Sequence, residues 1–231
     1  MTGWSDVITA AMTIIDDARW RDDLATSPAI FYRAKADYVR AAMPKLNRPP
    51  ELYAKLLAGM EEPAYDEAGW TSTAASMSAQ TTVNTGKTGY ALCSVAAYSA
   101  DRTKLSAYTD FTYNAETGDV VFGLQSAEGI EYTIDFYTDG EFPDLTPAQT
   151  DLFALAIAIV WDMRMDRNWL NLQMKIHDSS FSTANEGNYA EKINQRLMRN
   201  VQMFRDALNK YEQDCAYRGR FQNGNSGVVL V

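Results

Sequence analysis

The fold is decided by the segment TPAQTDLFALAIAIVW, residues 146–161. Its first four residues form a capping-box pattern, in which the Thr146 hydroxyl accepts from the amide three residues on while Gln149 reaches back. Pro147 stands at the first helical position, so a helix is predicted to begin at Thr146. Every residue from Leu152 to Trp161 is apolar. This run predicts a helix that is covered on all sides, either by its own domain or by neighbouring subunits, and it is shorter than the roughly 20 residues of a bilayer span.

Helix signals also stand on both sides of this segment. Before it, Ser5 begins a predicted first helix, Ser27 followed by Pro28 begins a second, and the pair Pro49-Pro50 opens a short third. After it, apolar residues recur every three or four positions between residues 193 and 215. Such a stripe predicts a long helix that packs on one partner face.

Between the helical parts the sequence favours strands. Eleven of the twenty residues from 71 to 90 are Thr, Ser or Gly, which suit strands and connections better than helices. Short β-like runs follow at residues 90–98, 108–113, 119–124 and 130–137, and Thr117-Gly118 separates two of them in the manner of a hairpin loop. We expect an antiparallel meander or a small sandwich.

The last of these runs alternates between apolar and polar residues. Tyr132, Ile134 and Phe136 take every second position. Because successive side chains of a strand point to opposite faces, Glu131 and Asp135 are expected on the face that water covers.

These patterns predict an α+β fold in which a helical bundle carries an inserted antiparallel β domain. The predicted units are residues 1–69 as the N-terminal helical part of the bundle, 70–145 as the β domain, 146–218 as the C-terminal helical part, and 219–231 as an extended tail.

Charge is segregated along the chain. From Leu105 to Met163, 59 residues include eleven carboxylates and no Lys, Arg or His, whereas the rest of the chain holds 19 acids against 21 bases. A surface of one sign repels like-charged polymers and attracts cations or basic partners. Sequence-specific DNA binding is therefore not expected.

The sequence offers no motif that carries catalysis. His177 is the only histidine, and although Asp178 stands beside it, adjacent residues rarely reach the geometry of a catalytic triad. Gly86-Lys87-Thr88 lacks the first glycine of a phosphate-binding loop, because Thr81 occupies that position. We predict no enzymatic activity, no cofactor and no metal.

Two other functions stay open. A carbohydrate-binding or receptor-side tail module would use exposed aromatic residues such as Tyr108, Tyr113, Tyr132 and Tyr137, although such residues more often form cross-strand pairs within a sheet. A glycan hydrolase, the less favoured alternative, would need two facing carboxylates.

The order of these parts resembles a known group of virion proteins. A helical hairpin is followed by Tyr108–Asn114, by Gly118-Asp119-Val120-Val121-Phe122, and by the strand run Gly129–Tyr137. This arrangement resembles the head-to-tail adaptor (connector or neck) proteins of tailed bacteriophages, over most of residues 4–217. The β segment is larger here than in the shorter members of that family.

The resemblance implies a structural protein of the virion neck, made in the host cytoplasm. Such adaptors form rings of about twelve copies under the portal and continue the DNA channel toward the tail. The implied partners are other copies of the chain, the portal protein, a tail or stopper protein, and double-stranded DNA that passes without sequence recognition. No membrane is implied.

Three sets of residues are candidates for these roles. Packing or oligomer contacts are assigned to Leu152, Ile157, Val160, Trp161, Val201, Phe204 and Leu208. A tail that docks on the portal or a neighbour is assigned to Val228, Val229, Leu230 and Val231, because apolar residues on a polar tether would otherwise stand in water. Groups that face the channel or a partner are assigned to Asp110, Glu116, Asp119, Glu131 and Asp135.

Overall fold

The computed structural model describes residues 1–99, 104–176 and 184–224, with side chains described in the ranges 1–99, 104–165 and 191–217. Its elements confirm the predicted α+β class. The helices are α1 (Trp4–Ile15), α2 (Ala18–Thr26), α3 (Pro28–Ala42), α4 (Pro50–Ala58), α5 (Pro147–Ile176), α6 (Ala184–Gly224) and the 3-10 helices η1 (Met43–Leu46) and η2 (Ala74–Met77). The strands are β1 (Thr2–Gly3), β2 (Ala64–Thr71), β3 (Thr81–Asn84), β4 (Leu92–Tyr98), β5 (Leu105–Tyr108), β6 (Phe111–Asn114), β7 (Asp119–Phe122), β8 (Glu131–Thr138) and β9 (Glu141–Phe142).

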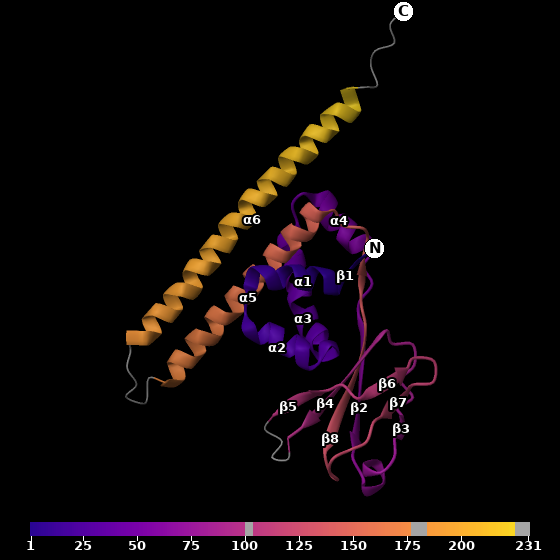
Figure 1. Cartoon of the computed structure of the whole chain (residues 1–231). Helices are drawn as coiled ribbons and strands as arrows, with labels where there is room; N and C mark the ends of the chain where they lie inside the picture. Colours follow the sequence, from indigo (N-terminus) through magenta and orange to yellow (C-terminus); the bar gives the residue numbers. More distant parts are fainter. Residues whose placement is uncertain (100–103, 177–183, 225–231) are drawn as a thin grey trace, which may run out of the picture.

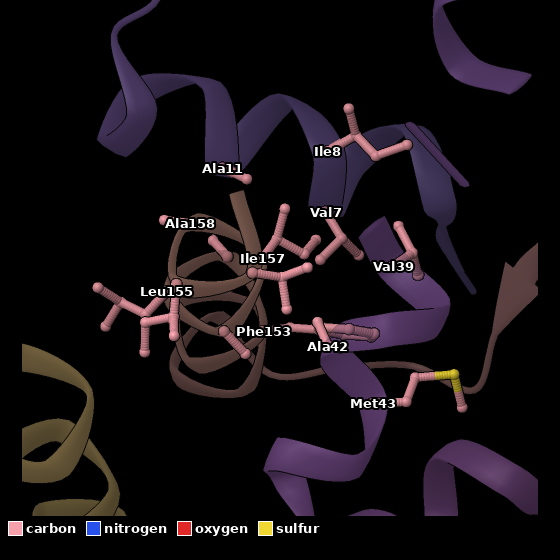
Figure 2. Packing of buried hydrophobic residues seen from close by; sticks show 14 of the residues in the cluster. Val7, Ile8, Ala11, Val39, Ala42, Met43, Phe153, Leu155, Ile157 and Ala158 are labelled. Carbon is pink, nitrogen blue, oxygen red and sulfur yellow. The ribbon is translucent and has the colours of Figure 1, made fainter. Parts of the chain in front are cut away.

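Helix α5 is the centre of the helical body. Its ten apolar residues, 152–161, each expose 8% or less of their surface, because α1, α3, η1 and α6 pack around them. Phe153 and Ile157 of α5 point toward Val7 of α1 and Ala42 of α3 (Figure 2). Burial of each large apolar side chain contributes about 1.5–3 kcal/mol. Of the two coverings that the sequence allows, the chain's own domain is the one observed. None of the described helices is long and apolar enough to cross a membrane.

Two helices begin where the local sequence predicts. The Thr146 backbone N–H donates to Oε1 of Gln149 at 2.9 Å, and the Gln149 N–H donates to Oγ1 of Thr146 at 3.4 Å, which confirms the capping box. Helix α3 begins at Pro28, as predicted. Its cap, however, comes from strand β4: Oγ of Ser94 accepts from the Ala29 N–H at 3.1 Å. The start of α3 is therefore fixed on the sheet.

The strands form a small sandwich of two antiparallel sheets. One sheet has the order β2-β8-β4-β5 and the other β3-β7-β6. Their facing sides share a core to which β8 contributes Tyr132, Ile134 and Phe136, and β7 contributes Val120 and Phe122. The far side of the larger sheet is covered by α3, which packs on β8 and β4.

A second junction joins the sandwich to the start of α1. The carboxylate of Asp139, which follows β8, accepts from the Ser5 N–H at 3.2 Å and from the Tyr137 hydroxyl at 2.9 Å. The Trp4 N–H donates to the carbonyl of Gly140 at 3.0 Å, and β1 pairs with β9. The carboxylate takes the place of a local N-cap for α1.

Helix α6 extends beyond the body. It has 41 residues, which corresponds to about 61 Å at 1.5 Å per residue. It lies along α5 and continues past the body on the side away from the sandwich (Figure 1). The C-terminal part of α6 and the loops of the sandwich thus lie on opposite sides of the helical body (Figure 1).

Some boundaries differ from the sequence prediction. Strand β2 begins at Ala64, before the expected β boundary at residue 70, and α6 continues to Gly224, past residue 219. The run 108–113 is divided between β5 and β6, which belong to different sheets. Helix α2 is not predicted, because Trp20 is its single buried residue and no apolar stripe marks it.

Candidate functional site: the arm and the acidic β surface

The predicted packing residues hold α6 on α5. Phe204 is 9% exposed, and Val201 and Leu208 pack beside it against the core of the helical body. The other four, Leu152, Ile157, Val160 and Trp161, are buried in α5. All seven therefore make contacts within one chain. We call residues 191–217 of α6 the arm.

A buried polar cluster ties the arm to α5. Asp162 is 1% exposed. Arg196 Nε donates to its Oδ1 at 2.6 Å, and Asn200 Nδ2 donates to its Oδ2 at 2.7 Å. Burial raises the pKa of the Asp162 carboxyl and outweighs the opposing effect of Arg196 and Asn200. We call Asp162, Arg196 and Asn200 the latch.

A second polar contact lies nearer the start of α5. Gln149 Nε2 donates to the Tyr211 hydroxyl at 2.6 Å. The same Gln149 side chain completes the capping box of α5. One amide therefore both starts α5 and holds the arm, which couples the position of the arm to the first turn of the central helix.

Beyond Tyr211 the arm leaves the body. Among the side chains of α6 that the structure describes, Tyr211 is the last apolar one that packs against the core. Tyr217 is 65% exposed, and Met198, on the outward side of the arm, is 67% exposed. Because α6 is buried along one stripe, the outward side is available to other molecules.

The predicted acidic residues differ in exposure. Asp110 and Glu116 are exposed. Asp119 is half-buried and accepts from Asn84 Nδ2 at 2.6 Å and from Thr117 Oγ1 at 2.7 Å. Glu131 is also half-buried. Asp110 and Glu116 are therefore the acids of this set that are most open to solvent.

The expectation that Asp135 faces water is wrong. Asp135 is 2% exposed, because α3 covers the face of the sheet on which it lies. The Tyr65 hydroxyl donates to its Oδ1 at 2.7 Å, whereas its Oδ2 meets no hydrogen-bond donor within the described residues. Burial raises the pKa of the Asp135 carboxyl, and Glu67 acts in the same direction. Asp135 is a structural group rather than a channel group.

The aromatic residues of the strands do not form an exposed platform. Tyr132 and Tyr137 are buried, and Tyr108 and Tyr113 pack against the core of the sandwich. Sugar stacking needs an open ring face. These four tyrosines therefore give no support to the carbohydrate-binding alternative.

Two hollows lie along α3. One, of about 430 Å³, lies between α3 and Tyr65 and Tyr137, and Asp37 is the one carboxylate in its lining. The other, of about 290 Å³, has Asp23 as the one carboxylate in its lining. Glycoside hydrolysis uses two carboxylates that flank a bond. Neither lining contains such a pair.

Two features of the sequence lie outside the described residues: His177 with its neighbour Asp178, and the predicted docking tail Val228–Val231. Comparisons of the chain with protein-family models, with curated proteins and with solved structures give no match.

Proposed function

We propose that this chain is a head-to-tail adaptor of a tailed bacteriophage, a structural protein that joins the portal to the tail without catalysis. Copies of the chain form a ring of about twelve members, the number that the resemblance implies, and the ring continues the DNA channel. The arm end contacts the portal, and the sandwich end contacts the tail or a stopper protein.

The observation that carries this proposal is the placement of two free ends on one helical body. The arm passes the body on one side, and the sandwich loops lie on the other (Figure 1). A connector needs two separate contact regions and a stiff part between them. Here the stiff part is the core around α5, to which α3 fixes the sandwich and the latch fixes the arm.

Charge supports a role beside DNA. The acidic segment has no bases, and Asp110 and Glu116 expose their carboxylates on the sandwich. A wall that carries such groups does not exchange counterions with phosphates, so DNA slides past it without being held. In this proposal these two residues face the channel.

The test is to mix the purified chain with the portal protein encoded near its own gene. Mass measurement and negative-stain microscopy should show a ring of the chain on the portal. A matched variant that lacks residues 225–231 should bind the portal more weakly, because it lacks the proposed docking tail. A chain that stays monomeric and does not bind the portal would refute the proposal.

A second measurement addresses the channel. The double change Asp110→Lys with Glu116→Lys should make the assembled ring retain double-stranded DNA at low salt, and the retention should fall as salt rises. The double change Glu51→Lys with Asp22→Lys, which alters the charge by the same amount at exposed positions of α4 and α2, is the control. Equal retention by both variants would place Asp110 and Glu116 away from the channel.

A further inference from the structure

An apolar patch lies at the end of the sandwich, where two loops meet. The first loop contains η2 and follows β2, and the second joins β7 to β8. Met77 of the first loop is 44% exposed and Leu124 of the second is 60% exposed. Exposed alanines from both loops accompany them: Ala74, Ala75 and Ala127. We call these five residues the tip.

The two loops are joined by hydrogen bonds that keep the tip in one shape. The Gln125 N–H donates to the carbonyl of Ser76 at 3.0 Å. The Ser72 hydroxyl donates to the carbonyl of Ala127 at 2.8 Å, and the Ile130 N–H donates to the Ser72 hydroxyl at 2.8 Å. The loops therefore move as one unit.

The residues that make these bonds are removed from water. Ser76 is 0% exposed, Ser72 is 2% exposed and Gln125 is 5% exposed. Gln125 Nε2 donates to the carbonyl of Gly123 at 2.7 Å and to the Tyr108 hydroxyl at 2.9 Å. These three polar residues are buried while Met77 and Leu124 are exposed, which is the reverse of what their side-chain chemistry favours in a surface loop.

Single apolar residues on a surface are normal and have no special meaning. The tip differs because its residues come from two loops that are hydrogen-bonded to each other, so they are held in place before any partner arrives. Preformed apolar anchors lower the entropy that is lost on binding, which is how binding surfaces gain affinity.

The charges around the tip limit the kind of partner that the tip can bind. Residues 71–80 contain no charged side chain, and residues 123–130 contain only Glu128. The carboxylate of Asp110 lies against Gly123, next to Leu124, so acids flank the patch. A second copy that used its own tip would bring these carboxylates together, which is unfavourable.

We propose that the tip is a docking site for a different protein that presents an apolar hollow with a basic rim. Met77 and Leu124 fill the hollow, and Glu128 meets the rim. This site goes beyond the proposed adaptor function, since it identifies which side chains contact a partner at the sandwich end and what chemistry that partner has.

The experiment measures binding of the immobilised chain to each purified protein encoded by the genes adjacent to its own. One of them should bind the wild type, and Met77→Asp and Leu124→Asp should each weaken that binding about tenfold or more. Glu128→Lys should weaken it and reduce its dependence on salt. Leu57→Asp is the matched control, because Leu57 is 51% exposed on α4, outside the tip, and should bind like the wild type.

The outcomes separate the two proposals. Absence of any bound protein, equal binding by wild type and Leu124→Asp, or self-association of the chain that Leu124→Asp abolishes would each overturn the docking site. Leu124→Ala, a milder change, serves if the aspartate variant melts early. Portal binding is measured on the same variants and should not change, so failure of the adaptor role appears as loss of portal binding in the wild type.

Discussion

Replacement of Asp162 by alanine should lower the free energy of unfolding by about 3 kcal/mol. This magnitude follows from what each partner in the latch loses. Asn200 is 1% exposed, so its amide loses an acceptor that water cannot replace, at a cost of about 1–3 kcal/mol. The Arg196 side chain is 30% exposed, so water recovers part of the about 3–5 kcal/mol that a broken buried pair costs.

Two other variants serve as comparisons for the predicted loss of stability. Asp162→Asn keeps one oxygen as an acceptor and has nearly the same volume, so its cost should be smaller than that of the alanine variant. Asp151→Ala removes an exposed acid from the first turns of the same helix and should change stability by less than about 0.5 kcal/mol. The comparison isolates the latch from the general effect of losing a carboxylate on α5.

The assay is urea unfolding followed by tryptophan fluorescence, which includes Trp161 next to the latch, together with hydrogen exchange of backbone amides. Because the latch joins only α5 and α6, exchange in Asp162→Ala should rise first in the arm and later in α1. An unchanged urea midpoint, or exchange that rises equally in α1 and the arm, would refute the reasoning.

Three further changes test the joins around the body. Burial raises the pKa of Asp135 in the folded chain above its usual value of 3.8, so the stability of the chain should fall as pH rises from that value through the folded pKa. In thermal melts at a series of pH values, Asp135→Asn should weaken this dependence of the melting temperature on pH. An unchanged dependence would contradict the prediction. Gly140→Ala would place Cβ 2.4 Å from the Glu61 carbonyl and should cost about 1–3 kcal/mol in urea unfolding, whereas Gly69→Ala, whose Cβ meets nothing closer than 3.9 Å, should not destabilise the chain. Ser94→Ala removes the acceptor that caps α3 and should cost about 1 kcal/mol, with faster exchange in the first turn of that helix; unchanged exchange there would exclude the capping role.

The parts of the fold that the sequence predicts are those with local causes. The capping box at Thr146 and the proline after Ser27 act within one turn, and both mark helix starts as expected. The hairpin loop at Thr117-Gly118 is also local: Gly118 has φ +72°, and its N–H donates to the Asn114 carbonyl at 2.9 Å. No distant residue is needed to predict these features.

The errors concern faces and partners that depend on distant segments. Alternation correctly places Asp135 and Ile134 on opposite faces of the sheet. It cannot show that α3, about a hundred residues earlier in the chain, covers the face on which Asp135 lies. No local pattern indicates the partner of Asp162, because residues two positions apart on a helix, such as Asp162 and Arg164, do not face each other. The partner of Asp162 is Arg196, on the next helix, because the fold brings α6 alongside.

The tip also depends on contacts between segments that are distant in the sequence. Its loops read as ordinary Ser- and Ala-rich connections, since Ser72 and Gln125 look like solvated residues in the sequence. Only their hydrogen bonds in the folded chain show that they hold the loops together. One sequence signal could have indicated the tip. Residues 71–80 contain no charged side chain, and residues 123–130 contain only Glu128.

One physical feature recurs at each place where parts of the molecule meet. Ser94 joins α3 to the sheet, the latch joins the arm to α5, and Ser72 joins the tip loops, and each join uses a polar group that is 5% exposed or less. Opening any of these joins leaves a buried donor or acceptor unpaired, which costs about 1–3 kcal/mol in addition to the cost of exposing apolar surface to water. These joins therefore resist small displacements of the arm and of the sandwich relative to the helical body. Such stiffness suits the proposed connector, which has to keep two partners in register, better than it suits a flexible tether, in which the same joins would be made by exposed residues.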